Sequence, residues 1–323
     1  MVRRRPFVVA SALAILSGTF TFQPAPFDSE WDTPALPFPR LANYFLGGPW
    51  PILQDLANWD FLILKLEHAD AARSIKQMNP GLKIVGYLAS EESSQPGSGP
   101  TNPSSGFSPD WWLRHSDGSH VTGWGGNLLI NVTRVSPEVN GNHWPDHLAS
   151  WVADRLAGDA VWDGVYYDNA WPTIDWKSTD LDLELSGKNE IETRGRRWVN
   201  DRWNEGMLDL MRRTRERLGT GAIVMGNGPL RATEFNNGRL FESFPNEWNP
   251  FYHFGGWTAA TLDYWEWHKA RYNNLFYVIA ANPSNSGGFD DFQRMRFGLA
   301  SSLMGDGYFA FDQGISNHAQ VWW

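Results

Sequence analysis

Eight short apolar runs alternate with polar and amphipathic segments along the chain. Each run is bounded by glycine, proline, asparagine or acidic residues, as buried strands of a parallel sheet usually are. We predict strands at 41–46, 60–66, 82–88, 163–168, 222–226, 240–241, 275–281 and 308–311, and helices at 69–78, 136–156, 193–218, 258–272 and 289–304. Strands that alternate with helices in this way predict a single (β/α)8 TIM barrel.

A long insertion follows the third predicted strand, from residue 91 to residue 127. It is rich in Ser, Gly and Pro at its start and then carries Trp111, Trp112, Asp117-Gly118 and Trp124. Loops of this length inside a domain are usually functional or disordered, and Asp-Gly between aromatic segments is a hairpin signal. We therefore expect an ordered lobe over the barrel mouth.

The two ends of the sequence differ from the predicted barrel. Residues 1–26 combine a basic start at Arg3, Arg4 and Arg5 with an apolar core and a Pro-Ala-Pro segment, which is typical of a secretory signal peptide. Residues 27–323 then form the catalytic domain, and we expect secretion to the extracellular space or periplasm. The sequence reaches Trp323 without an eighth helix, as in a barrel truncated after strand eight.

Composition narrows the function further. The net charge of −9 becomes −12 without Arg3, Arg4 and Arg5, so a nucleic-acid partner is not expected, and no apolar run is long enough for a membrane span. The chain has no Cys, which excludes thiol nucleophiles and thiolate metal sites. It has 19 Trp, whose flat rings suit the CH faces of sugars, although most of them are expected in the core.

Acidic and amide side chains stand at the ends of the predicted strands, where TIM barrels carry their active sites. No phosphate-binding loop, GxSxG or HExxH motif is present, so carboxylates are the groups left for chemistry. The strand-end residues are Gly47, Glu67, Glu91, Glu92, Asp168, Asn227, Glu242, Asn282 and Asp312.

Asp168 and Glu242 are the catalytic candidates, because two carboxyl groups on either side of a glycosidic bond can carry out its hydrolysis. They stand two strands apart, Asp168 as nucleophile and Glu242 as acid/base. The alternatives are that Asp168 caps a turn and that Glu242 forms a salt bridge with Arg239 or Arg231. For substrate binding we assign Glu91, Glu92, Trp124, Asn169, Trp171, Asn227 and Asp312.

Metal and cofactor sites are not expected. Asp180, Asp182, Glu184 and Gly187 are spaced partly as in a calcium loop, but Glu184 departs from that pattern and Thr193 stands where a closing Glu would be needed. His143 and His147 are four residues apart, but Pro145 between them indicates a helix start and no third ligand is close in sequence.

Several motifs carry a resemblance to a known family. They are Gly86-Tyr87-Leu88 followed by Glu91-Glu92, residues 163–169, residues 225–228, Phe241-Glu242-Ser243 and residues 308–312. With these motifs the chain resembles the glycoside-hydrolase-like TIM barrels called hypothetical glycosyl hydrolase group fifteen. More distantly it is similar to endo-α-1,4-polygalactosaminidases and the α-galactosidase-type clan. The resemblance implies Asp168, after strand four, as nucleophile and Glu242, after strand six, as acid/base.

The sequence thus predicts a secreted glycoside hydrolase that cleaves O-glycosidic bonds of an extracellular or cell-envelope polysaccharide, with retention of configuration. The alternative is a non-catalytic carbohydrate-binding barrel, for which aromatic stacking alone would suffice. An enzyme needs both carboxylates in one cleft, whereas a binding protein does not. An esterase or deacetylase is disfavoured because its nucleophilic Ser motif or metal ligands are lacking.

Overall fold

The computed structural model describes residues 39–45, 53–93, 107–242, 244, 256–267, 278–281 and 292–311. The chain divides into two units, residues 1–36 and 37–323, and every described residue belongs to the second. The predicted signal peptide therefore lies outside the described residues. Among the described helices, none is long and apolar enough to cross a membrane.

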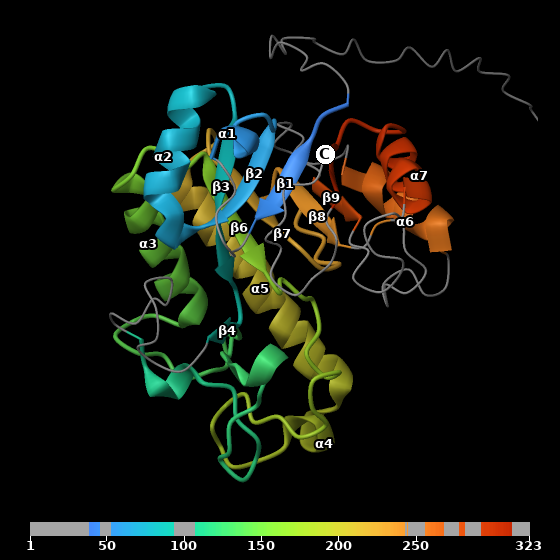
Figure 1. Ribbon diagram of the computed structural model, residues 1–323. Helices are drawn as coiled ribbons and strands as arrows, with labels where there is room; N and C mark the ends of the chain where they lie inside the picture. Colours follow the sequence, from blue (N-terminus) through green and yellow to red (C-terminus); the bar gives the residue numbers. More distant parts are fainter. Residues whose placement is uncertain are drawn as a thin grey trace, which may run out of the picture. The chain divides into compact units, whose positions relative to one another are not determined.

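The described part of the second unit has an α/β fold built on a curled parallel sheet (Figure 1). The strand order is β1-β2-β3-β6-β7-β8-β9-β10, and every neighbouring pair is parallel. All eight predicted strand positions are confirmed. The strands are β1 Ala42–Phe45, β2 Phe61–Lys65, β3 Lys83–Ala89, β6 Gly164–Asp168, β7 Ile223–Gly226, β8 Gly238–Glu242, β9 Val278–Ala281 and β10 Tyr308–Phe311.

The first and last strands also meet. Leu41, immediately before β1, forms a parallel bridge with Phe309 of β10, and Phe309 N donates to Arg40 O at 2.8 Å. The first and last strands of the sheet are thus hydrogen-bonded near their amino ends.

Helices connect most of the strands. They are α1 Leu53–Leu56, α2 Ala69–Met78, α3 Trp144–Ala157, α4 Glu190–Arg194, α5 Arg196–Leu218, α6 Gly256–Glu266 and α7 Phe292–Ser302. The helix predicted from residue 136 begins later, at Trp144, because Asn140 and Gly141 adopt positive φ values of 51° and 78° that interrupt a helix. A capping box between His143 and Asp146 then starts α3, with Pro145 in its first turn.

The connection from β7 to β8, residues 227–237, is fully described and contains no helix. The buried guanidinium of Arg215 on α5 supports it instead. Arg215 donates to Phe235 O at 2.8 Å, to Ala222 O at 2.7 Å and to the side chain of Asn237. One side chain of α5 thereby binds the end of the connection near β8 and the residue immediately before β7.

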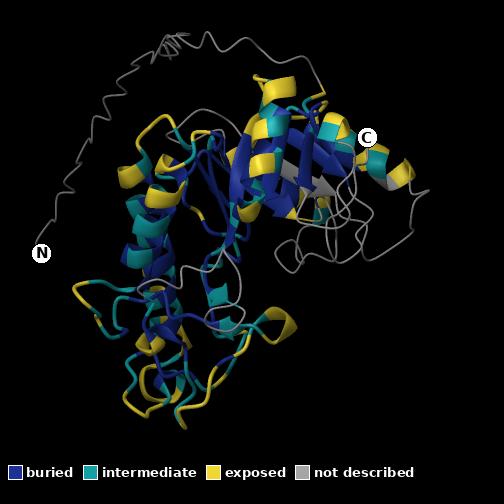
Figure 2. Cartoon of the chain, turned by 60° about the vertical axis from the view of Figure 1, so that its left-hand side comes forward, coloured by how far each residue is buried: buried dark blue, intermediate teal, exposed yellow. Residues whose placement is uncertain are grey.

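Alternation along the strands separates an inner core from an outer one. Among the described side chains, the inner core draws on seven of the eight strands. Its residues are Ala42, Tyr44, Phe61, Ile63, Val85, Tyr166, Ile223, Met225, Leu240, Tyr308 and Ala310. The strands are buried almost throughout, while exposed residues lie on helices and loops (Figure 2).

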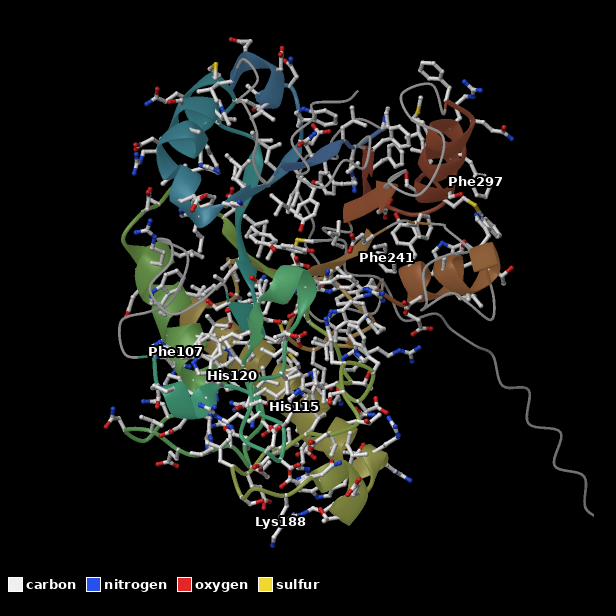
Figure 3. All side chains as sticks on the ribbon, turned by 60° about the horizontal axis from the view of Figure 1, so that its bottom comes forward. Phe107, His115, His120, Lys188, Phe241 and Phe297 are labelled. Atoms are coloured by element: carbon white, nitrogen blue, oxygen red, sulfur yellow. The ribbon has the colours of Figure 1, made fainter. Side chains whose placement is uncertain are left out.

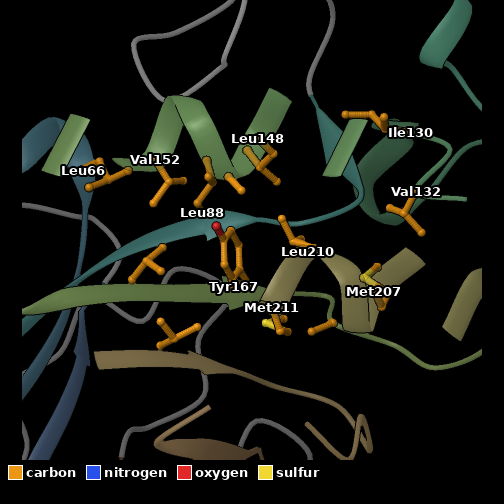
Figure 4. Packing of buried hydrophobic residues seen from close by; sticks show 14 of the residues in the cluster. Leu66, Leu88, Ile130, Val132, Leu148, Val152, Tyr167, Met207, Leu210 and Met211 are labelled. Carbon is orange, nitrogen blue, oxygen red and sulfur yellow. The ribbon is translucent and has the colours of Figure 1, made fainter. Parts of the chain in front are cut away.

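The outer core fills the space between the sheet and the helices. Tyr167 of β6 lies between α3 and α5 with Leu148, Leu210 and Met211 around it (Figure 4). Its hydroxyl forms a 2.8 Å hydrogen bond with Thr214 Oγ1, which satisfies a polar group that would otherwise be buried without a partner. Tyr166 and Tyr167 thus anchor opposite faces of one strand.

The insertion after β3 forms an ordered lobe, which we define as residues 107–133 and 172–189. Its hairpin turns at Asp117-Gly118 as predicted, with His115 N donating to Ser119 O at 2.8 Å. Two short strands, β4 Glu92–Ser93 and β5 Leu128–Leu129, pair antiparallel at its base. Figure 3 shows His115 and His120 of this hairpin.

The second segment of the lobe, after β6, was not predicted to belong to it. Asp182 N donates to Arg114 O at 2.8 Å, and Asn131 Nδ2 donates to Leu183 O at 2.8 Å. Asp180 accepts from Ser116 N and Oγ at 3.0 and 2.9 Å. The segments after β3 and β6 therefore form one structure.

Charged groups tie the end of this lobe to the helices. Arg134 donates to Asp146 of α3 and to Asp209 of α5, and Arg213 binds the same two carboxylates. The helices α3 and α5 also pack closely on each other. Where the lobe meets α5, Gly206 of α5 lies against the backbone of Val132 and Thr133.

This contact generates a stability prediction. A Cβ on Gly206 would clash with the carbonyl of Val132, so we expect Gly206→Ala to lower the free energy of unfolding by about 1–3 kcal/mol. The loss should occur although Ala is favoured over Gly in helices by about 1 kcal/mol. Urea unfolding measures it. Gly158→Ala is the matched control, since Gly158 has helical dihedrals and only ordinary contacts, and a similar loss there would contradict the explanation.

Candidate active site

Asp168 ends β6, and its carboxylate is held by groups from three strands. Tyr87 Oη of β3 donates to Oδ2 at 2.8 Å, and the side-chain amide of Asn227, immediately after β7, donates to Oδ1. Asn169 N also donates to Oδ1, at 2.9 Å. These bonds fix the orientation of a half-buried carboxylate at the carboxyl end of the sheet.

The backbone after Asp168 turns sharply. Asn169 has a φ of 57°, a left-handed conformation that asparagine tolerates better than most residues. Ser90 Oγ donates to Asn169 O at 3.0 Å, and Asn227 Oδ1 accepts from Ala170 N at 3.2 Å. The turn that presents Asp168 is therefore held from both neighbouring strands.

Three tyrosines, Tyr44, Tyr87 and Tyr166, lie together beneath this carboxylate. Their ring centroids are 5.6–6.2 Å apart. Burial raises the pKa of each hydroxyl above its ordinary value, and the charge of Asp168 raises it further, with Glu242 adding to the effect. The hydroxyls therefore stay protonated and can act as donors.

Glu242 ends β8 and reaches the same region. It follows Leu240 by two residues, and Leu240 belongs to the inner core, so Glu242 continues the inward-facing row of β8 just as Asp168 continues that of Tyr166. Its effect on the pKa of all three tyrosines agrees with this placement. Glu242 is exposed, and Arg239 pairs with Asp263 rather than with Glu242.

Glu91 and Glu92 follow β3 and lie near Asp168. Glu91 is only 1% exposed, and its Oε2 has no hydrogen-bond partner among the described residues. Burial raises the pKa of Glu91 well above its ordinary value of 4.5; Lys177 opposes the shift, while Glu92 and Asp168 add to it. Burial also raises the pKa of Glu92, whose carboxylate accepts from Trp124 N at 3.3 Å and Asn127 Nδ2 at 3.2 Å.

The other assigned binding residues fall into three groups. Trp124 is 60% exposed on the lobe. Asn169, Trp171 and Asn227 are engaged within the protein: Trp171 Nε1 donates to Asn169 Oδ1 at 3.4 Å, and Asn227 is 4% exposed with its amide on Asp168 and Ala170. Asp312 lies outside the described residues, as do Gly47 and Asn282.

Sequence reasoning missed the three tyrosines and Lys177. The tyrosines could have been found, because Tyr166 stands two residues before Asp168 and must face the same side of the strand. Lys177 gave no such signal, because only the folding of the lobe brings it to Glu91 and Glu92.

The side chains of the two possible metal sites in the sequence interact with other residues of the protein instead. Asp182 accepts from Ser186 N and Gly187 N, and Glu184 pairs with Arg194. His147 packs on Trp111 and Trp144. In the part of the chain that the structure describes, no group of three or more His, Asp or Glu residues is arranged to hold a metal ion.

The resulting site has an oriented carboxylate, a second carboxylate on the inward side of a strand two positions along the sheet, and protonated tyrosine donors next to Asp168. Such an arrangement suits glycosidic bond cleavage, which needs a nucleophile or base together with an acid. Exposed Trp124 adds a surface on which a sugar ring can stack.

Comparison with known protein families agrees with this chemistry. The sequence profile described as hypothetical glycosyl hydrolase family 15 matches residues 76–322. This match places the chain among the glycoside hydrolases. The chain belongs to hypothetical glycosyl hydrolase family 15.

A search of curated protein sequences found no match. Among solved structures, the glycoside hydrolase domain of PelA from Pseudomonas aeruginosa is 14% identical, with a TM-score of 0.48 over 87% of this chain and 96% of that one. Ega3 from Aspergillus fumigatus, in complex with galactosamine, is 11% identical, with a TM-score of 0.48 over 86% and 93%. The chitinase domain of CotE from Clostridium difficile is 12% identical, with a TM-score of 0.42 over 79% and 68%. With TM-scores this low, the family match alone carries the classification.

The buried Glu91 gives a prediction about pH. Because its pKa is raised in the folded state, the stability it contributes is complete below its unfolded pKa of about 4.3 and is lost as pH rises through the folded pKa. Glu91→Gln cannot ionise, so its stability relative to the wild type should improve as the pH rises above the unfolded pKa of Glu91.

Urea unfolding across this range measures the effect. Glu192→Gln, at an exposed position on α4, is the control and should leave the pH dependence unchanged. A constant difference between Glu91→Gln and the wild type at every pH would show that folding does not raise the pKa of Glu91.

Proposed function

We propose that the chain is a secreted glycoside hydrolase that cleaves O-glycosidic bonds of an extracellular or cell-envelope polysaccharide by a two-carboxylate mechanism. The observation that carries the proposal is that Asp168 and Glu242 end β6 and β8 of one sheet, each two residues after a residue of the inner core, Tyr166 and Leu240. Two carboxylates that face one cluster are what a hydrolase needs, and a protein that only binds sugar does not.

We infer that the eight strands close into a full (β/α)8 barrel. The bridge between Leu41 and Phe309 and the hydrogen bond from Phe309 to Arg40 support closure between β1 and β10. In a closed barrel the carboxyl ends of β6 and β8 border one mouth, which lets Asp168 and Glu242 reach opposite sides of a bound sugar.

In the proposed reaction, Asp168 attacks the anomeric carbon while Glu242 donates a proton to the leaving glycosidic oxygen. Tyr87, Asn227 and the backbone of Asn169 hold the nucleophile in place during this step. Glu242 then accepts a proton from water, whose oxygen attacks the anomeric carbon and releases Asp168. The sugar leaves with its original configuration, and both carboxyl groups return to their starting states.

Secretion is proposed from the sequence of residues 1–26, which combines a basic start with a short apolar core. Export of the enzyme also suits a polymeric substrate, which does not enter cells intact. The polysaccharide itself is proposed from the aromatic composition and from the exposed aromatic surface near the site.

Substitution of the two carboxylates tests the mechanism. We expect Asp168→Asn and Glu242→Gln each to reduce release of reducing ends from the degraded polysaccharide by about 10²–10⁴-fold, with the fold intact by circular dichroism. On aryl glycosides with good leaving groups, glycosyl transfer by Glu242→Gln should be nearly normal, because protonation is then not needed, whereas Asp168→Asn should stay inactive.

Exposed Asp201→Asn and Glu192→Gln are the matched controls and should keep wild-type rates. Full activity in either site variant would remove that residue from the mechanism. A wild-type protein that binds polysaccharides but cleaves none would make the chain a binding protein instead.

The stereochemical outcome is a separate prediction. We expect the first-formed sugar product to keep the anomeric configuration of the substrate, as when two carboxyl groups lie about 5–5.5 Å apart. Proton NMR during the first minutes of hydrolysis, before the product mutarotates, measures it, and the pure sugar followed under the same conditions is the control. An inverted product would assign Asp168 to activating water and imply a carboxyl separation of about 6.5–9.5 Å.

A further inference from the structure

An aromatic surface on the lobe continues from the candidate active site. Lys177 Nζ lies 4.7 Å from the ring centroid of Trp124 and 4.4 Å from that of Trp176. Trp124 is 60% exposed and Trp176 is 46% exposed. We call these three residues, with Glu92, the Trp platform.

The indole rings of this platform are fixed in place by the protein. Trp176 Nε1 donates to Thr173 O at 3.0 Å, and its ring packs against Trp171 at a centroid distance of 5.2 Å. Trp124 N donates to Glu92, and the ammonium of Lys177 rests on both indoles. A cation on an aromatic face is favourable by about 0.5–1 kcal/mol at exposed sites, so the rings are held ready before a ligand arrives.

Lys177 brings hydrogen-bond donors to this surface. It is half-buried, and no described residue lies within ion-pair or hydrogen-bond distance of its ammonium, although Glu91 and Glu92 are close enough to influence its pKa. Its three N–H groups and the carboxylate of Glu92 flank an apolar indole surface. Flat apolar faces edged by donors and acceptors match a pyranose ring, whose CH face is apolar and whose hydroxyls lie at its edge.

The charges of the surface balance. The platform has one acidic side chain, Glu92, which accepts from Trp124 N, and one basic side chain, Lys177, which lies over both indole rings. The surface therefore offers no net charge that would select an acidic or a cationic sugar.

The platform is also continuous with the site of cleavage. Ala89 of β3 lies opposite Asp168 in the sheet, and Glu92, three residues further along, contacts Trp124 and Asn127 on the lobe. A polymer bound at Asp168 would thus extend past Glu92 onto the lobe.

We propose that Trp124, Trp176, Lys177 and Glu92 form a saccharide subsite that holds one uncharged pyranose ring of the polysaccharide, separate from the ring attacked by Asp168. The subsite rests on the proposed hydrolase function and adds to it an extended binding path along the polymer. A substrate too short to reach the lobe would not use it.

Binding is tested without turnover, in an Asp168→Asn background. Soluble polysaccharides are cast in native gels, and the retardation of the protein is measured. Three are neutral (a β-glucan, a galactomannan and a xylan), one carries uronates (alginate) and one carries amines (chitosan). We expect retardation by a neutral polymer, and about tenfold weaker binding in Trp124→Ala, Trp176→Ala and Lys177→Met. Trp124→Phe should restore part of the affinity because it keeps a stacking face. Trp265→Ala, at a 39% exposed position on α6, is the matched control and should bind normally.

Turnover separates this proposal from the proposed function. In the active background, the platform variants should lose kcat/KM on the polymer by about tenfold but keep it on a short aryl glycoside. If the Trp124 and Trp176 variants bind and cleave the polymer like the wild type, the subsite is overturned and the hydrolase is not. Binding that depends on these residues without any cleavage by the wild type overturns the hydrolase and leaves the subsite. Retardation only by alginate or chitosan, or by no polymer, overturns the uncharged ring as ligand.

Discussion

The side chain of Asn227 is the contact on which the candidate site depends most. Its amide donates to Asp168 and accepts from Ala170 N, and its own backbone N–H donates to Tyr167 O at 3.2 Å. It therefore joins the end of β7 to three residues around the turn after β6, namely Tyr167, Asp168 and Ala170. That turn includes Asn169 in a left-handed conformation, which costs free energy unless the surroundings hold it. Ser90 provides the opposite support from β3, and Trp144 Nε1 donates to Ser90 O at 2.8 Å. The orientation of one carboxylate is thus set by the packing of three strands and a helix.

The electrostatics of the site follow from where water is excluded. Tyrosines can lie under Asp168 because a neutral phenol is much less costly to bury than a charge, and each hydroxyl then meets a carboxylate or another ring. The same burial raises the pKa of Glu91 and so favours its neutral form beside Asp168, which reduces the repulsion between the two carboxyl groups. Glu242 remains exposed, where it can exchange protons with solvent. One region therefore contains carboxyl groups in different environments, a condition for separate roles.

The parts of the fold that depend on local sequence patterns could be predicted from the sequence. All eight strands were found because parallel strands are continuous apolar runs, and the hairpin at Asp117-Gly118 because its turn residues are specific. The start of α3 was missed because Ser136 looks like a helix cap, whereas its Oγ bonds to Thr133 O and the positive φ at Asn140 intervenes. The lobe's second segment was missed because the contact between Asp180 and Ser116 spans 64 residues. Asp168 and Glu242 could be named from strand ends, but Lys177 joins the site only through that distant pairing, which no local pattern records.

The helix-free connection between β7 and β8 has a consequence for the order of assembly. At its end near β8, the carbonyl of Phe235 and the side chain of Asn237 accept hydrogen bonds from Arg215, which lies near the end of the 23-residue helix α5. Burying these acceptors without that donor would cost about 1–3 kcal/mol each, so the connection gains its native packing only together with α5. The segment that carries Asn227 therefore has little reason to adopt its native path early in folding. The carboxylate of Asp168 would acquire its fixed orientation late, after the helix and both neighbouring strands are in place.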